Sequence, residues 1–64
     1  MKTTDAFRLS RIQAEGWNAA RRLPASHLAE MDHEKVDALN PYSTKSERIR
    51  WNAGFQGALD SWQR

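Results

Sequence analysis

The chain has 64 residues, ten cations against eight acids, and only ten Leu, Ile, Val and Phe side chains, so one small core would contribute roughly 3–5 kcal/mol. It has no cysteine, which excludes disulfides, thiolate catalysis and cysteine metal sites. Apolar runs never exceed two residues, so we expect neither a membrane span nor a signal peptide, and we expect a cytoplasmic protein.

The charges divide the chain into two basic arms and an acidic middle. The net charge is +3 over residues 1–22, −3 over residues 23–40 and +2 over residues 41–64. The overall net charge of +2 therefore averages three segments with different expected surfaces.

Residues 5–23 have the periodicity of an amphipathic helix. Their apolar and small residues share an arc of about 160°: Ala6, Leu9, Ile12, Gly16, Trp17, Ala19, Ala20 and Leu23. The opposite arc is basic and holds Arg8, Arg11, Arg21 and Arg22. Pro24 is expected to end this helix.

The acidic segment 24–40 predicts one short helix, whose inner face would hold Leu28, Met31, Val36 and Leu39. Its start is left open between caps at Ser26 and Asp32. It should stop at Asn40, because the residue before a proline is pushed out of the helical region.

Residues 45–62 predict a second long helix. Thr44 and Glu47 have the spacing of a capping box at its start. Its apolar arc holds Trp51, Phe55, Ala58, Leu59 and Trp62, and Arg48 intrudes into that arc, where it could lie across a tryptophan face. The predicted fold is a small all-α domain over residues 1–64, with a two-helix core and a short third helix.

A repeat links the two long helices. The sequence Gly-Trp-Asn-Ala-Ala at 16–20 aligns with Gly-Phe-Gln-Gly-Ala at 54–58, at an offset of 38 residues. Either chance and packing explain the match, or the two segments are related. In both cases small residues at these positions suit helices that pack closely together.

The second half of the chain, which contains the second copy of the repeat, resembles the ribosome modulation factor family of small bacterial proteins. The resemblance depends on Pro41-Tyr42 followed by Arg48, Trp51, Gly54, Phe55 and Ala58, seven positions that agree without a gap. The first half matches the family's Gly-aromatic-x-Ala-small pattern at Gly16, Trp17, Ala19 and Ala20. Together these positions define a core motif of Gly16, Trp17, Ala20, Pro41, Trp51, Gly54, Phe55 and Ala58.

The chain departs from the family pattern in three ways. Segment 24–40 is an acidic insertion between the two motif helices, the net charge is lower than in ribosome-binding members, and Asn40 stands where some members have Cys. The insertion therefore falls outside what the resemblance describes.

The resemblance implies a non-enzymatic regulator that binds the 30S ribosomal subunit or its rRNA, promotes inactive ribosome dimers and inhibits translation in the stress response known as ribosome hibernation. Basic residues suited to phosphate contacts and base stacking agree with RNA binding. The candidate nucleic-acid-binding residues are Arg8, Arg11, Arg21, Arg22, Tyr42, Arg48 and Arg50. For charge alone, an ordinary solvated helix face explains the arginines better, and for Tyr42 a place in the core competes with base stacking.

Enzymatic and metal functions have little support in the sequence. His33 and Asp37 could share a helix face near His27, but no third ligand follows at a recognised spacing, so no metal, cofactor or catalytic residue is expected. The alternative function is a protein-interaction module, an inhibitor or adaptor such as mobile elements encode, that meets a basic partner through the acidic insertion. We expect a monomer or a weak dimer and no membrane partner.

Overall fold

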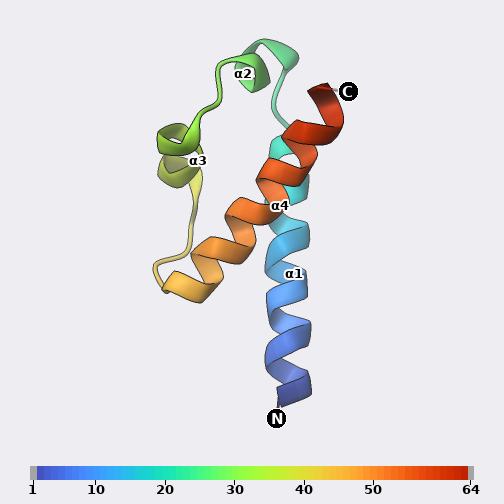
Figure 1. The fold of residues 1–64 in the computed structure, drawn as a ribbon, viewed down its shortest axis with the longest axis vertical. Helices are drawn as coiled ribbons and strands as arrows, with labels where there is room; N and C mark the ends of the chain where they lie inside the picture. Colours follow the sequence, from blue (N-terminus) through green and yellow to red (C-terminus); the bar gives the residue numbers. More distant parts are fainter. Residues whose placement is uncertain (1, 64) are drawn as a thin grey trace.

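The structure is a computed structural model that describes the backbone of residues 2–63 and the side chains of residues 6–63. No strand occurs in this part of the chain, so the predicted all-α class is confirmed. Figure 1 shows the four helices, which are α1 (Lys2–Arg21), α2 (Ala25–Ala29), α3 (His33–Leu39) and α4 (Lys45–Gln63).

The two long helices lie close to their predicted positions. Helix α4 has the predicted start and extends one residue beyond the predicted end. Helix α1 begins at Lys2, before residue 5, and ends at Arg21 rather than at residue 23. Pro24 does end this run: it lies in the extended region at φ −67° and ψ 156° and is the N-cap of α2.

The connection holds two short helices, so the prediction of one helix was wrong. Asp32 has extended backbone angles of −137° and 179°, and its side chain accepts a hydrogen bond from the Lys35 N–H at 2.9 Å. This cap starts α3 and breaks the helical run after α2, because an N-cap residue is not itself helical. Leu28 and Val36 are buried, as expected, but Leu39 is 48% exposed.

Helices α1 and α4 pack with their backbones in contact where they cross. A Cβ atom added to Gly16 would lie 2.0 Å from the carbonyl oxygen of Trp51, and one added to Gly54 would lie 1.8 Å from that of Gln13. Both distances are far below van der Waals contact, so the predicted close approach at the two Gly-aromatic motifs is confirmed.

The crossing has an approximate two-fold symmetry. Each glycine meets the carbonyl of the residue three positions before the other glycine, and both contacts obey the offset of 38 residues. Four residues after each glycine, Ala20 and Ala58 are also buried. Small residues four apart on both helices let the backbones approach. The repeat therefore has a physical meaning in the fold, because both copies form one helix crossing.

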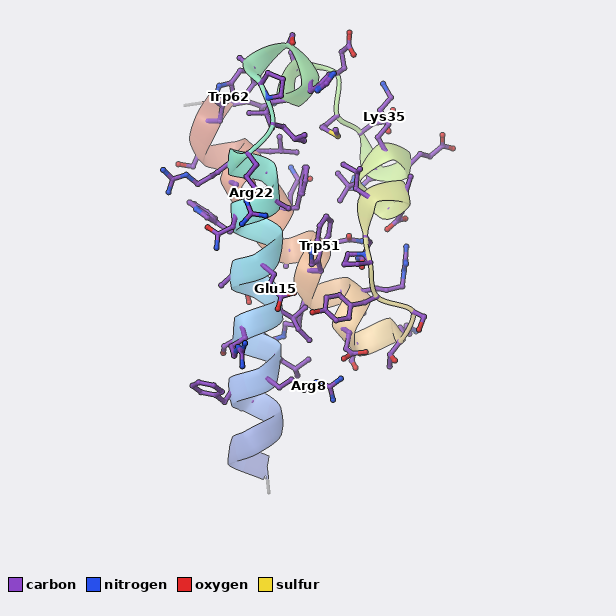
Figure 2. All side chains as sticks on the ribbon, turned by 180° about the vertical axis from the view of Figure 1, so that it is seen from behind. Arg8, Glu15, Arg22, Lys35, Trp51 and Trp62 are labelled. Atoms are coloured by element: carbon purple, nitrogen blue, oxygen red, sulfur yellow. The ribbon has the colours of Figure 1, made fainter. Side chains whose placement is uncertain are left out.

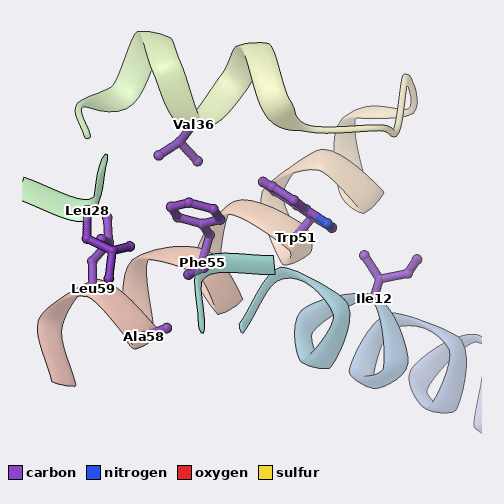
Figure 3. Packing of buried hydrophobic residues seen from close by; sticks show 8 residues of the cluster. Ile12, Leu28, Val36, Trp51, Phe55, Ala58 and Leu59 are labelled. Atoms are coloured by element: carbon purple, nitrogen blue, oxygen red, sulfur yellow. The ribbon is translucent and has the colours of Figure 1, made fainter. Parts of the chain in front are cut away.

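Helices α1 and α4 run in the same general direction, and Figure 1 shows both rising toward the end of the molecule where the C-terminus lies. The connection through α2 and α3 returns along one side of this pair. Val36 of α3 lies over the ring of Phe55, which is fully buried, and Leu28 lies beside Leu59 (Figure 3). The ring of Trp51 stacks on that of Phe55 with centroids 5.3 Å apart.

Three residues that the sequence places in the core are partly or fully exposed. Trp17 occupies the position that the symmetry relates to Phe55, yet it is 36% exposed, and Trp62 near the end of α4 is 45% exposed. Pro41 is exposed as well. The predictions that these three residues belong to the core were wrong: Pro41 lies in the connection before α4, and Trp17 and Trp62 line an open groove at the C-terminal ends of the two long helices. The other six residues of the predicted core motif, Gly16, Ala20, Trp51, Gly54, Phe55 and Ala58, are buried.

Candidate nucleic-acid interface

The candidate arginines fall into two groups, of which the first is engaged within the molecule. The Arg8 guanidinium pairs with the carboxylate of Glu47. That carboxylate makes no hydrogen bond to Thr44 within residues 6–63, so the predicted capping box is wrong. Arg50 donates to the side-chain oxygen of Gln13 at 3.2 Å.

Arg48 holds the connection against α4. Its guanidinium donates to the carbonyl oxygen of Tyr42 at 2.7 Å and to that of Asp37 at 3.1 Å, and it lies 3.5 Å from the Asp37 carboxylate. These contacts use the donors that phosphate would otherwise meet. Arg48 does not lie across a tryptophan face as one reading of the sequence suggested; it supports the backbone between α3 and α4.

Tyr42 is part of the same support. Its ring packs against the core cluster, and its hydroxyl donates a hydrogen bond to the carboxylate of Glu15 on α1. This hydrogen bond raises the pKa of the Tyr42 phenol above its usual 10.0, and loss of hydration and the negative charge of Glu15 act in the same direction. Of the two roles considered for Tyr42, the contacts favour a place in the core.

The Tyr42 contact predicts a pH dependence. Because the folded-state pKa is raised, the contact stabilises the fold fully below pH ~10, and this stabilisation is lost as the pH rises through the folded-state pKa. We expect Glu15→Ala to return the titration midpoint toward 10, since it removes both the acceptor and the charge. The chain has a single tyrosine, so ultraviolet absorbance of the phenolate reports it directly. Glu34→Ala, a control on α3, should leave the midpoint unchanged; an unchanged midpoint in Glu15→Ala would contradict the assignment.

Asn40 organises the turn before α4 and was missed as a structural residue. It is 9% exposed, and its amide donates to the Arg48 carbonyl at 3.1 Å and to the Asn52 side-chain oxygen at 2.8 Å. Its own side-chain oxygen accepts the Tyr42 N–H at 2.9 Å. The amide of Asn52 in turn donates to the Asp37 carboxylate at 2.7 Å. The available signal was an asparagine directly before a proline at the end of a short helix, a position that favours local side-chain hydrogen bonds.

The second group of arginines, Arg11, Arg21 and Arg22, is exposed on and just after α1. Within residues 6–63 their guanidinium groups make no ion pair or hydrogen bond to another side chain or to the backbone. Arg11 and Arg22 are eleven residues apart, close to three helical turns, so they project from the same side of the helix. Figure 2 shows Arg22 at the end of α1 away from Arg8.

The acidic insertion does not neutralise this second group. Glu30, Asp32 and Glu34 are exposed, and among the side chains described none of them pairs with an arginine of α1. Asp37 pairs with Arg48 of α4 instead. The insertion thus lies along one side of the helix pair and leaves the three arginines of α1 accessible.

The described residues offer neither a metal site nor a membrane-spanning helix. No three or more His, Asp or Glu side chains within the described residues are placed to hold a metal ion. None of the helices described combines the length and the apolar character that crossing a bilayer requires. Comparison with family models, with curated proteins and with solved structures gives no match. The resemblance to ribosome modulation factors therefore stays a hypothesis based on the residues themselves.

Proposed function

We propose that this chain is a small, non-enzymatic RNA-binding regulator that acts on the ribosome, as the resemblance to ribosome modulation factors implies. The observation that carries the proposal is the second group of arginines. Three exposed guanidinium groups without an acidic partner among residues 6–63 form a surface that suits phosphate oxygens.

The residues that carry the resemblance to ribosome modulation factors form the helix crossing and the core, and these hold α1 in place. Gly54 forms the helix crossing, Trp51 and Phe55 fill the core beside it, and Arg48 fixes Tyr42. A chain that has the family's scaffold residues is expected to present the first helix in a similar way. On this scaffold the arginines of α1 are the candidates for contact with rRNA, and Arg8, Tyr42 and Arg48 act as supports.

Binding to 30S subunits is expected to depend on salt and on the arginines of α1. Each phosphate contact releases counterions, so affinity should fall as the salt concentration rises. In Arg11→Ala combined with Arg22→Ala we expect at least a tenfold loss of affinity and a salt slope reduced by about two. Co-sedimentation with purified 30S subunits over a range of salt concentrations measures both quantities.

The matched control is Lys35→Ala combined with Lys45→Ala, which removes the same charge from the other elements. This control should bind nearly as well as the wild type. Equal losses in both double variants would mean that only net charge matters. No co-sedimentation of the wild type at low salt would contradict the proposed function.

The alternative, a protein-interaction module, has one observation in its favour. Glu30, Asp32 and Glu34 are exposed on the connection, and Leu39 exposes half of its side chain on the same segment. A basic protein partner would use these residues. Its binding should disappear in Glu30→Gln combined with Glu34→Gln, persist after RNase treatment and not depend on Arg11 and Arg22.

A further inference from the structure

A groove lies between the C-terminal ends of the two long helices and α2. It has a volume of about 520 Å³ and opens to solvent. Its floor is apolar, with Ala20, Leu28 and Ala58, and Trp17 and Trp62 line it from α1 and α4. Figure 2 shows Trp62 beside α2 at this end of the molecule. A groove of this size is in the range that takes a small ligand or a single nucleotide unit.

The aromatic walls of the groove are only partly buried in the fold. The symmetry relates Trp17 to Phe55, but Phe55 is fully buried, whereas Trp17 and Trp62 stay partly exposed. Two large exposed aromatic side chains on one groove are costly for so small a protein. They are typical of a binding surface.

The charge of the groove indicates what it binds. Arg21 lines it, and its guanidinium has no acidic partner within residues 6–63. Arg22 follows about 100° further round the helix, on the side of Arg11. An occupant therefore needs a flat apolar part for the tryptophans and negative charge that continues from the groove onto α1.

We propose that this groove takes an unpaired base of single-stranded RNA. The base stacks on Trp17 or Trp62, and the adjoining phosphates meet Arg21 and Arg22. Aromatic stacking with neighbouring cations is the general way in which proteins hold single strands, because every base has a flat face and every link carries a charge. The inference rests on the proposed RNA-binding function and adds that the RNA is unpaired at the contact.

The test compares a labelled uridine octamer with a labelled RNA hairpin of equal phosphate number, whose strands are joined by a non-nucleotide linker so that all of its bases are paired, by fluorescence anisotropy at one low salt concentration. We expect the octamer to bind at least fivefold more tightly, because stacking adds to the phosphate contacts. Trp62→Ala should weaken octamer binding about tenfold and leave hairpin binding nearly unchanged, and Trp62→Phe should restore most of the loss. The octamer should also quench the tryptophan fluorescence of the wild type.

Phe7→Ala is the matched control, because Phe7 is an exposed aromatic residue of α1 that does not line the groove. It should bind both RNAs like the wild type. Equal affinity of the wild type for octamer and hairpin, with no effect of Trp62→Ala, would overturn this inference and leave the proposed function intact. Binding of neither these RNAs nor 30S subunits would remove both.

Self-association is the other outcome that would overturn the inference. If the wild type sediments as a dimer, and Trp62→Ala makes it a monomer without changing octamer affinity, then the groove serves a second copy of the chain. Sedimentation velocity of the wild type, Trp62→Ala and Phe7→Ala in the same buffer decides this.

Discussion

Gly16→Ala is expected to destabilise the protein by about 2 kcal/mol. The added methyl would lie 2.0 Å from a backbone carbonyl oxygen of α4, so the helices would have to move apart along the whole crossing. Alanine gains about 1 kcal/mol of helix propensity, but overpacking costs about 1–3 kcal/mol or more, and backbone cannot move aside as a side chain can. Against a core worth roughly 3–5 kcal/mol, a net loss of about 2 kcal/mol removes much of the stability. Circular dichroism during urea titration measures the loss.

Gly54→Ala should be equally harmful, because the same contact occurs in the other direction at 1.8 Å. Gly57→Ala is the matched control on α4. There an added Cβ would meet only the Trp17 ring, at 3.3 Å, and Trp17 is partly exposed and able to shift. Gly57→Ala should therefore be neutral or stabilise the protein by up to about 1 kcal/mol. Wild-type stability in Gly16→Ala and Gly54→Ala would contradict the close crossing.

Asn40→Ala is expected to destabilise the protein by about 2–3 kcal/mol. It removes two donated hydrogen bonds and one accepted hydrogen bond at a buried position, and leaves the Tyr42 N–H and the Asn52 side-chain oxygen without a partner. The turn before α4 should then open, and the Tyr42 amide should exchange faster with solvent. Urea denaturation and amide hydrogen exchange measure the two effects.

Two comparisons make the Asn40 prediction specific. Asn40→Asp keeps the shape and the acceptor but loses both donated hydrogen bonds, and it adds a negative charge near Asp37, so it should destabilise about as much as Asn40→Ala. Asn18→Ala replaces an exposed asparagine within α1 and should cost nothing, since alanine is the better helix former. If Asn40→Asp has the same free energy of unfolding as the wild type, the donated hydrogen bonds contribute little to stability.

The long helices were predictable because their periodicity is local information. Residues 45–62 carry their own apolar face. The glycines at 16 and 54, within the two copies of the repeat, indicate a close crossing. The break at Asp32 depends on which of two competing local structures wins. A side-chain cap and a continued helix are close in energy, so the residue pattern alone did not decide between them.

The candidate site was less predictable because it depends on which side of each helix the connection covers. The periodicity places Arg8 and Arg22 on the same arc of α1, yet the start of α4 brings Glu47 only to Arg8. In the same way Trp17 and Phe55 have equivalent places in the repeat, and only Phe55 lies under α3. Which arginine is free and which aromatic is exposed are properties of the assembled chain.

The parallel arrangement of α1 and α4 also sets the order in which the protein can form. Gly16 contacts residues more than half the chain away, so no local hairpin brings the two long helices together, and folding should be slow for an all-helical protein of this size. An isolated helix of this length is marginal in water, so α1 gains little stability alone. At about 5–20 residues per second of synthesis, the 38 residues between Gly16 and Gly54 correspond to about 2–8 s during which α1 has no partner. Until α4 is synthesised, Ile12, Gly16 and Ala20, which are buried in the folded protein, have no helix to pack against.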